Sequence, residues 1–121
     1  MTAEKQCIVI VEDEPDILDM VTDVLELEGF DVIAFNRPFD PSTLRIDPDL
    51  FVVDLMLPGQ SGIELAKRLR WQGFRSVPMI AMSASSKMLR AAEQSGLFQA
   101  LLAKPFDLLR LLQMIETHLP A

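Results

Sequence analysis

Short apolar runs recur along the chain at nearly even intervals, each bounded by polar or turn-forming residues. Most of the runs are continuously apolar, and Val and Ile are prominent in the first three. That composition is typical of strands that are buried on both faces of a parallel sheet. The pattern therefore predicts five strands, at residues 7–11, 31–35, 50–55, 79–82 and 100–103.

The segments between these runs carry a helical period instead. In 15–28 the apolar residues have the i, i+3, i+4, i+7 spacing of a helix with one buried face. Those residues are Ile17, Met20, Val21, Val24 and Leu27. Similar patterns predict helices at 61–72, 86–95 and 107–118, and Ser61 and Asp107 are placed to cap two of them.

Segment 36–48 departs from this alternation because Pro38, Pro41 and Pro48 interrupt it. The prolines leave room for at most a short or degenerate second helix, with Asp40 as its cap. Strands that alternate with helices form right-handed βαβ units. We therefore expect a single α/β domain at 1–121, a doubly wound parallel sheet with helices on both faces.

Reactive side chains are concentrated at the predicted carboxyl ends of the strands, where open parallel sheets bind their ligands. They are Glu12, Asp13 and Glu14 after the first strand, Asp54 at the end of the third, Ser83 after the fourth and Lys104 after the fifth. Acids at 12–14 alone would suit the start of a helix. Asp54 is different, because an unpaired carboxylate that follows a buried apolar run is costly.

Crowded carboxylates repel one another unless solvent or a cation neutralises them. Mg²⁺ is bound by one or two carboxylates together with carbonyls and water, which suits Asp13 and Asp54 as direct ligands and Glu12 as a direct or water-mediated one. Lys104 and the Ser83 hydroxyl could then contact phosphoryl oxygens. In this interpretation Asp54 is the nucleophile and forms an aspartyl phosphate.

Four segments in this order resemble the receiver domain of two-component response regulators. They read VIVEDE at 9–14, VDLMLPGQSG at 53–62, AMSA at 81–84 and KPF at 104–106. Each segment alone is a weak signal, whereas the four together at these separations are specific, and the resemblance covers the whole chain.

The resemblance implies a flavodoxin-like fold and a set of roles. Glu12 and Asp13 are the acid pair for Mg²⁺, Asp54 is the phosphoacceptor, and the Met56 carbonyl completes the metal site. Ser83 is the switch hydroxyl, and Lys104 contacts the phosphoryl group. The phosphoryl donor would be a histidine kinase or a phosphotransfer protein.

The sequence departs from the family pattern in three places. The family usually has Tyr or Phe three residues before the lysine, where this chain has Leu101. Gly96 lies one residue further from the lysine than is common, and the second helix is broken by prolines. Leu101 therefore leaves open a second hypothesis, a receiver-like interaction module that does not switch.

The resemblance also points to an output surface made by the fourth helix, fifth strand and fifth helix, here 86–95, 100–103 and 107–118. We expect Leu109, Leu112 and Ile115 to face inward, which leaves part of the remaining apolar set exposed for a homodimer or an output partner. That set comprises Met88, Leu97, Phe98, Leu101, Leu108, Leu111 and Met114.

Composition and charge exclude other classes of protein. One cysteine and one histidine cannot build a disulfide framework or a structural zinc site. The net charge of −7 argues against direct binding to nucleic acid. No apolar run is long enough to span a membrane and the first residues do not resemble a leader, so we expect a cytoplasmic protein.

Two enzyme classes with the same topology fit poorly. A flavodoxin would need a hydroxyl-rich or Gly-rich phosphate loop after the first strand, where this chain is acidic. A phosphatase of the haloacid dehalogenase type would need a second Asp two residues after the nucleophile, where this chain has Met56.

Overall fold

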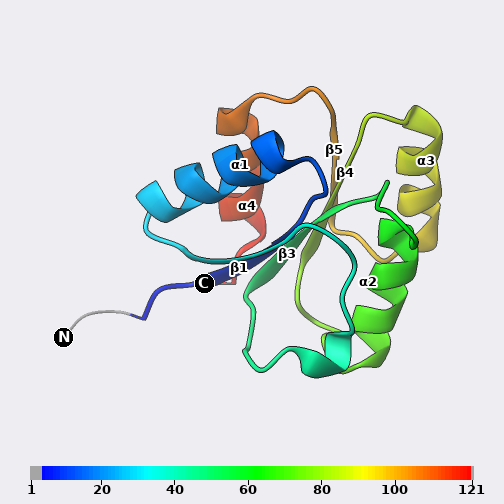
Figure 1. Ribbon diagram of the computed structural model, residues 1–121, viewed down its shortest axis with the longest axis horizontal. Helices are drawn as coiled ribbons and strands as arrows, with labels where there is room; N and C mark the ends of the chain where they lie inside the picture. The colour runs from blue at the N-terminus through cyan, green and yellow to red at the C-terminus, as the bar shows by residue number, and fades with distance from the viewer. Residues whose placement is uncertain (1–3, 121) are drawn as a thin grey trace.

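Every strand of the sheet runs parallel to its neighbours (Figure 1). The computed structural model describes residues 4–120. The strands are β1 (Cys7–Val11), β2 (Asp31–Phe35), β3 (Leu50–Asp54), β4 (Met79–Ser83) and β5 (Ala100–Ala103), in the spatial order β2-β1-β3-β4-β5. This order confirms the predicted doubly wound, flavodoxin-like α/β fold. Strand β3 ends one residue earlier than predicted, and β4 ends one residue later.

Within residues 4–120, four α-helices cover the sheet, two on each face (Figure 1). Helices α1 (Pro15–Leu27) and α4 (Leu108–His118) lie on one face, and α2 (Gly62–Trp71) and α3 (Ser86–Ser95) lie on the other. The predicted degenerate helix is a single 3₁₀ turn, η1 (Pro41–Thr43), capped by Asp40.

Side-chain oxygens cap three of the four α-helices. The hydroxyl of Ser61 accepts a hydrogen bond from the Glu64 backbone N–H, and the carboxylate of Asp107 accepts one from Leu109. Both caps were predicted from the sequence. Ser85 caps α3 in the same way, a role that the sequence analysis did not assign.

The sheet divides the core into two apolar layers, because successive strand residues point to opposite faces. Ile8, Ile10, Val52 and Ile80 belong to the layer under α1 and α4. Alternate residues such as Val9, Val11, Phe51 and Val53 belong to the layer under α2. This double burial explains why the central strands are continuously apolar in sequence.

The buried stripes of α1 and α4 differ from those predicted. Helix α1 buries Leu18, Val21 and Leu25, whereas Leu27 is 87% exposed. Both possible stripes of this helix are apolar in sequence, so periodicity alone could not choose between them.

In α4 the predicted inward residue Leu109 is 60% exposed, and Leu111 is buried with Ile115. Apolar residues lie on several sides of this helix, which allows either orientation. Of the seven residues predicted to supply an exposed patch, Leu111 is buried and the other six are half-buried. The predicted orientation of α4 was therefore wrong, and the exposed leucine of this helix is Leu109.

None of the helices within residues 4–120 has the length and apolar content that crossing a membrane requires.

Gly62 brings the start of α2 against the end of β3. Its backbone N–H donates to the Leu55 carbonyl oxygen at 2.9 Å. A Cβ at this position would lie 2.2 Å from the Asp54 carbonyl oxygen and 2.8 Å from the Leu55 Cα. Both neighbours are backbone atoms, so any larger residue must push α2 away from the strand that carries Asp54.

We expect Gly62→Ala to lower the free energy of unfolding by about 1–3 kcal/mol, the usual cost of overpacking. For a domain of this size that is a fall in Tm of about 4–12 °C, measurable by thermal denaturation. Gly59→Asn is the matched control, because Gly59 has φ +77° and open space around its Cβ position, and Asn tolerates that backbone conformation. Equal stability of Gly62→Ala and the parent would contradict the packing argument.

Candidate functional site

Three carboxylates meet at the carboxyl ends of β1 and β3. Strand pairing places Val11 beside Val53, so Glu12 and Asp54 follow side by side, and Asp13 comes next along the chain. One carboxylate oxygen from each acid lies within 4.8 Å of the others. Glu12 is fully buried and Asp54 nearly so, whereas Asp13 is exposed.

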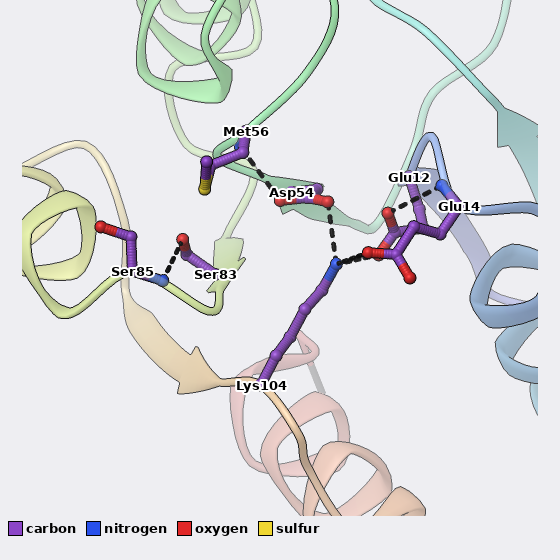
Figure 2. Close-up of polar contacts among 7 residues, drawn as sticks. All are labelled: Glu12, Glu14, Asp54, Met56, Ser83, Ser85 and Lys104. Carbon is purple, nitrogen blue, oxygen red and sulfur yellow. Dashed lines mark hydrogen bonds and ion pairs between the residues drawn. The ribbon is translucent and has the colours of Figure 1, made fainter.

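Lys104 reaches this cluster from the loop after β5 (Figure 2). Its Nζ lies 2.6 Å from Glu12 Oε1, 2.9 Å from Asp54 Oδ2 and 3.8 Å from Glu14 Oε1. The Lys104 backbone N–H donates to the Ser83 carbonyl oxygen, which anchors the loop to β4, and the Lys104–Pro105 peptide bond is cis. One ammonium group is therefore the shared partner of three carboxylates from two strand ends.

Burial and charge shift the pKa values of two of these groups. The pKa of Glu12 is raised to about 7, because burial and the neighbouring Asp54 raise it by more than Lys104 and the Glu14 N–H lower it. Burial lowers the pKa of Lys104, but its contacts with Glu12 and Asp54 outweigh burial, and the net shift is upward. Lys104 therefore stays charged, whereas Glu12 exchanges its proton near neutral pH.

The remaining predicted site residues surround Asp54. The Met56 backbone N–H donates to Asp54 Oδ1 at 3.0 Å, and its side chain is exposed. Ser83 is buried on the β4 side of Asp54, opposite Glu12, and its Oγ accepts from the Ser85 N–H at 3.0 Å (Figure 2). Leu101 is half-buried on β5 and packs in the cluster of Leu55 and its neighbours.

Two residues have contacts in the site that the sequence did not predict, Glu14 and Ser85. Glu14 contributes a carboxylate near Lys104, and its own N–H donates to Glu12 Oε2 at 3.2 Å. Ser85 links Ser83 to the start of α3, because it donates to Ser83 and caps the Met88 N–H. A serine directly before a helical segment is an N-cap signal that could have identified Ser85.

The donor set fits a small divalent cation. All three acids offer oxygen, which Mg²⁺ prefers, and one of them is exposed and accessible from solvent. The approach of Lys104 to Glu12 Oε1 lacks hydrogen-bond geometry, so this buried oxygen has an ion-pair partner but no hydrogen bond among the described residues. One ammonium group does not balance three carboxylates, and a further cation would.

Comparison with known proteins agrees with this geometry. The family model for the response regulator receiver domain matches residues 8–116. The uncharacterized transcriptional regulatory protein YbdJ of Bacillus subtilis is 32% identical over 115 residues, which are 92% of this chain and 51% of YbdJ. The phosphate regulon transcriptional regulatory protein PhoB of Pseudomonas aeruginosa is 36% identical over 83 residues, 66% of this chain and 36% of PhoB. The matched part of the chain thus spans about half the length of YbdJ and a smaller part of PhoB.

Solved structures share the fold. The chemotaxis response regulator CheY4 of Vibrio cholerae superposes with a TM-score of 0.85 at 21% identity, covering 96% of this chain and all of CheY4. The response regulator TrrA of Thermotoga maritima, solved in complex with Mg²⁺-BeF, gives 0.82 at 24% identity, covering 94% of this chain and 99% of TrrA.

The family model extends from β1 to the last turns of α4 and includes all four motif segments found in the sequence. It also includes the acid cluster, Ser83 and Lys104. The chain therefore belongs to the response regulator receiver domains, the signalling domains of two-component systems.

Proposed function

We propose that this domain accepts a phosphoryl group on Asp54 in a Mg²⁺-dependent reaction, from a histidine kinase or a phosphotransfer protein. The convergence of Asp54 with two further carboxylates and Lys104 at one end of the sheet supports the proposal. Asp54 is the acid that ends a buried strand, so its position is fixed by the sheet itself.

The two oxygens of Asp54 have different surroundings. Oδ1 is held by the Met56 N–H, which leaves Oδ2, the oxygen bound by Lys104, as the attacking atom. A bond forms between Oδ2 and phosphorus while the bond from phosphorus to the donor nitrogen breaks, and that nitrogen keeps the electron pair. Lys104 then moves from the carboxylate to an oxygen of the transferred group.

Glu12, Asp13 and Asp54, together with the Met56 carbonyl, are the proposed ligands of Mg²⁺. When bound, the ion would offset the negative charge of the phosphoryl oxygens beside these carboxylates. The exposed Asp13 marks the side from which an ion enters, and the buried Glu12 forms the floor of the site.

Ser83 is the proposed link from the phosphoryl group to the output surface. Its hydroxyl hydrogen is free to donate to a phosphoryl oxygen while its oxygen accepts from Ser85. Any displacement of Ser83 acts on the Ser85 cap of α3, and so on the face of α3, β5 and α4. We propose that this face, with the exposed Leu109, carries the interaction with an output partner.

The alternative is an interaction module of the same fold that does not switch. Leu101 favours it, because an aliphatic side chain packed beside Ala81 and Ala92 offers no ring to rotate. Phosphorylation of Asp54 that leaves the α3 and α4 resonances unchanged in NMR spectra would support this alternative.

Incubation with acetyl phosphate and Mg²⁺ should add the mass of one phosphoryl group to the parent chain and none to Asp54→Asn, as measured by intact mass spectrometry. Asp49→Asn is the control, since Asp49 precedes β3 at the amino ends of the strands, away from the site, where it accepts a hydrogen bond from the Cys7 N–H. Full labelling of Asp54→Asn would refute the assignment.

Asp13→Asn should weaken Mg²⁺ binding about tenfold or more, because it removes a charged oxygen ligand from the exposed side of the site. Titration calorimetry measures the affinity. Asp16→Asn, an acid in the first turn of α1 outside the cluster, should bind Mg²⁺ like the parent. Equal weakening by both variants would indicate a general charge effect rather than ligation.

The raised pKa of Glu12 predicts a pH-dependent stability of the metal-free protein. Between pH 4.5, the ordinary pKa of a glutamate, and about pH 7, Glu12 keeps a proton in the folded state that it has lost in the unfolded chain. The contribution of this proton to stability is therefore complete below pH 4.5 and is lost as the pH rises through 7.

Glu12→Gln cannot titrate, so in the presence of a chelator it should melt above the parent at pH 8. The difference in Tm between the variant and the parent should shrink toward pH 4.5. Each kcal/mol in the free energy of unfolding corresponds to about 4 °C. Thermal denaturation across this range measures both proteins. A gap that is constant with pH would exclude Glu12 as the titrating group.

A further inference from the structure

The two most exposed large apolar side chains within residues 4–120 have surroundings of opposite charge. Leu27 is 87% exposed at the end of α1, and Trp71 is 83% exposed at the end of α2. These helices cover opposite faces of the sheet (Figure 1). Exposed side chains of this size are common sites of protein association when their surroundings are complementary to a partner.

Trp71 stands between two hollows lined by basic residues. One hollow, of about 470 Å³, is bounded by Lys67, Arg75 and the loop before β5. The other, of about 320 Å³, is bounded by Arg68 and Pro41 of η1. In sequence, 65–92 contains six basic residues and no acid.

These bases are only partly neutralised. Lys67 pairs with Glu64 at 3.3 Å and Arg68 with Asp40 at 3.6 Å, both at the surface. Arg75 has no ion-pair partner within the described residues. The Trp71 surface, defined as Trp71 with Lys67, Arg68 and Arg75, therefore retains positive charge.

Arg70 fixes this surface in place from beneath. Its guanidinium donates to the carbonyl oxygens of Phe74 and Leu97 at 2.7 Å and to Gln99 Oε1 at 3.1 Å. These bonds tie the end of α2 to the loop before β5. The backbone under Trp71 is therefore held before any partner arrives, which lowers the entropy cost of docking.

Leu27 has acidic surroundings. The neighbouring exposed residues Asp23, Glu26, Glu28 and Asp31 carry four negative charges, and 12–31 contains no basic residue. Glu26 and Glu28 also lie at the carboxyl end of α1, where the helix dipole disfavours acids. Residues 23–31 form the acidic end of α1, a surface that a cationic partner would stabilise.

We infer that the Trp71 surface of one copy binds the acidic end of α1 of a second copy. The contact joins an apolar centre with a basic rim to an apolar centre with an acidic rim. Such a match supplies both the desolvated anchor and the charge complementarity of an interface. This inference is independent of phosphorylation and of the proposed function.

The arrangement dictates a head-to-tail assembly. The two surfaces lie on opposite faces, so each copy offers one of each and the contact is heterologous. The net charge of −7 opposes association at long range. At physiological ionic strength, charges are screened over about 8 Å, so the contacting pairs act while the overall repulsion is reduced. The expected association is weak and grows with concentration.

Sedimentation velocity at chain concentrations up to about 1 mM should show an average mass that rises with concentration in the parent. Trp71→Ala and Leu27→Ala should each raise the dissociation constant at least about tenfold. An equimolar mixture of the two variants should recover a dimer and nothing larger, because each variant keeps one intact surface. Both side chains are exposed, so neither change disturbs the core.

Leu109→Ala is the matched control, since Leu109 is exposed on α4 outside both surfaces and should leave association unchanged. Reversal of Lys67 and Arg75 to Glu should abolish association, and further reversal of Glu26 and Glu28 to Lys should restore it. A parent that is monomeric at every concentration would overturn the inference. So would loss of association in Leu109→Ala but not in Trp71→Ala, which would place the interface on the α4 face.

Discussion

The mutual repulsion of the acids at the ends of β1 and β3 is the constraint around which this end of the molecule is organised. Glu12 and Asp54 are buried, and Lys104 brings the positive charge that allows them to stay there. Removing one partner from such a buried group leaves uncompensated charge, which costs far more than a surface pair would. Because its side chain is long, Lys104 reaches from the loop after β5 to acids at the ends of β3 and β1.

The backbone makes this crowding unavoidable. Strands β1 and β3 are neighbours in the sheet and parallel, so their carboxyl ends reach the same level. Apolar residues fill both faces beneath the acids, which leaves the strand ends as the place where polar groups can meet solvent. The close approach of Gly62 holds the start of α2 against the backbone at the end of β3, next to Asp54.

Sequence patterns predicted which side chains gather at this end of the sheet, because these residues directly follow the strands. Glu12, Asp13, Asp54 and Lys104 follow apolar runs whose burial leaves little freedom of register, and the structure brings these four together. The strands were predicted from their continuous apolar runs and the four helices from their helical apolar spacing. The degenerate second helix was predicted from the three prolines in 36–48.

The apolar pattern did not predict which side of a helix faces the sheet. Leu109 and Leu111 are chemically alike and two positions apart, so only tertiary packing decides which is buried. The full burial of Glu12 also depends on tertiary structure, and a linear pattern does not encode it. The hydrogen bond from the Ser85 N–H to Ser83 Oγ, in contrast, joins residues two positions apart and is local in sequence.

The helices differ in how firmly they are anchored to the sheet. Helix α2 buries four residues and α1 three, whereas α3 buries Ala92 alone and otherwise packs through the half-buried Met88 and Leu89. Displacing a helix costs less free energy when it buries fewer apolar side chains, so α3 is the helix that is displaced at the lowest cost. The element capped by Ser85 is thus the one whose position a change at the strand ends can alter with the least work.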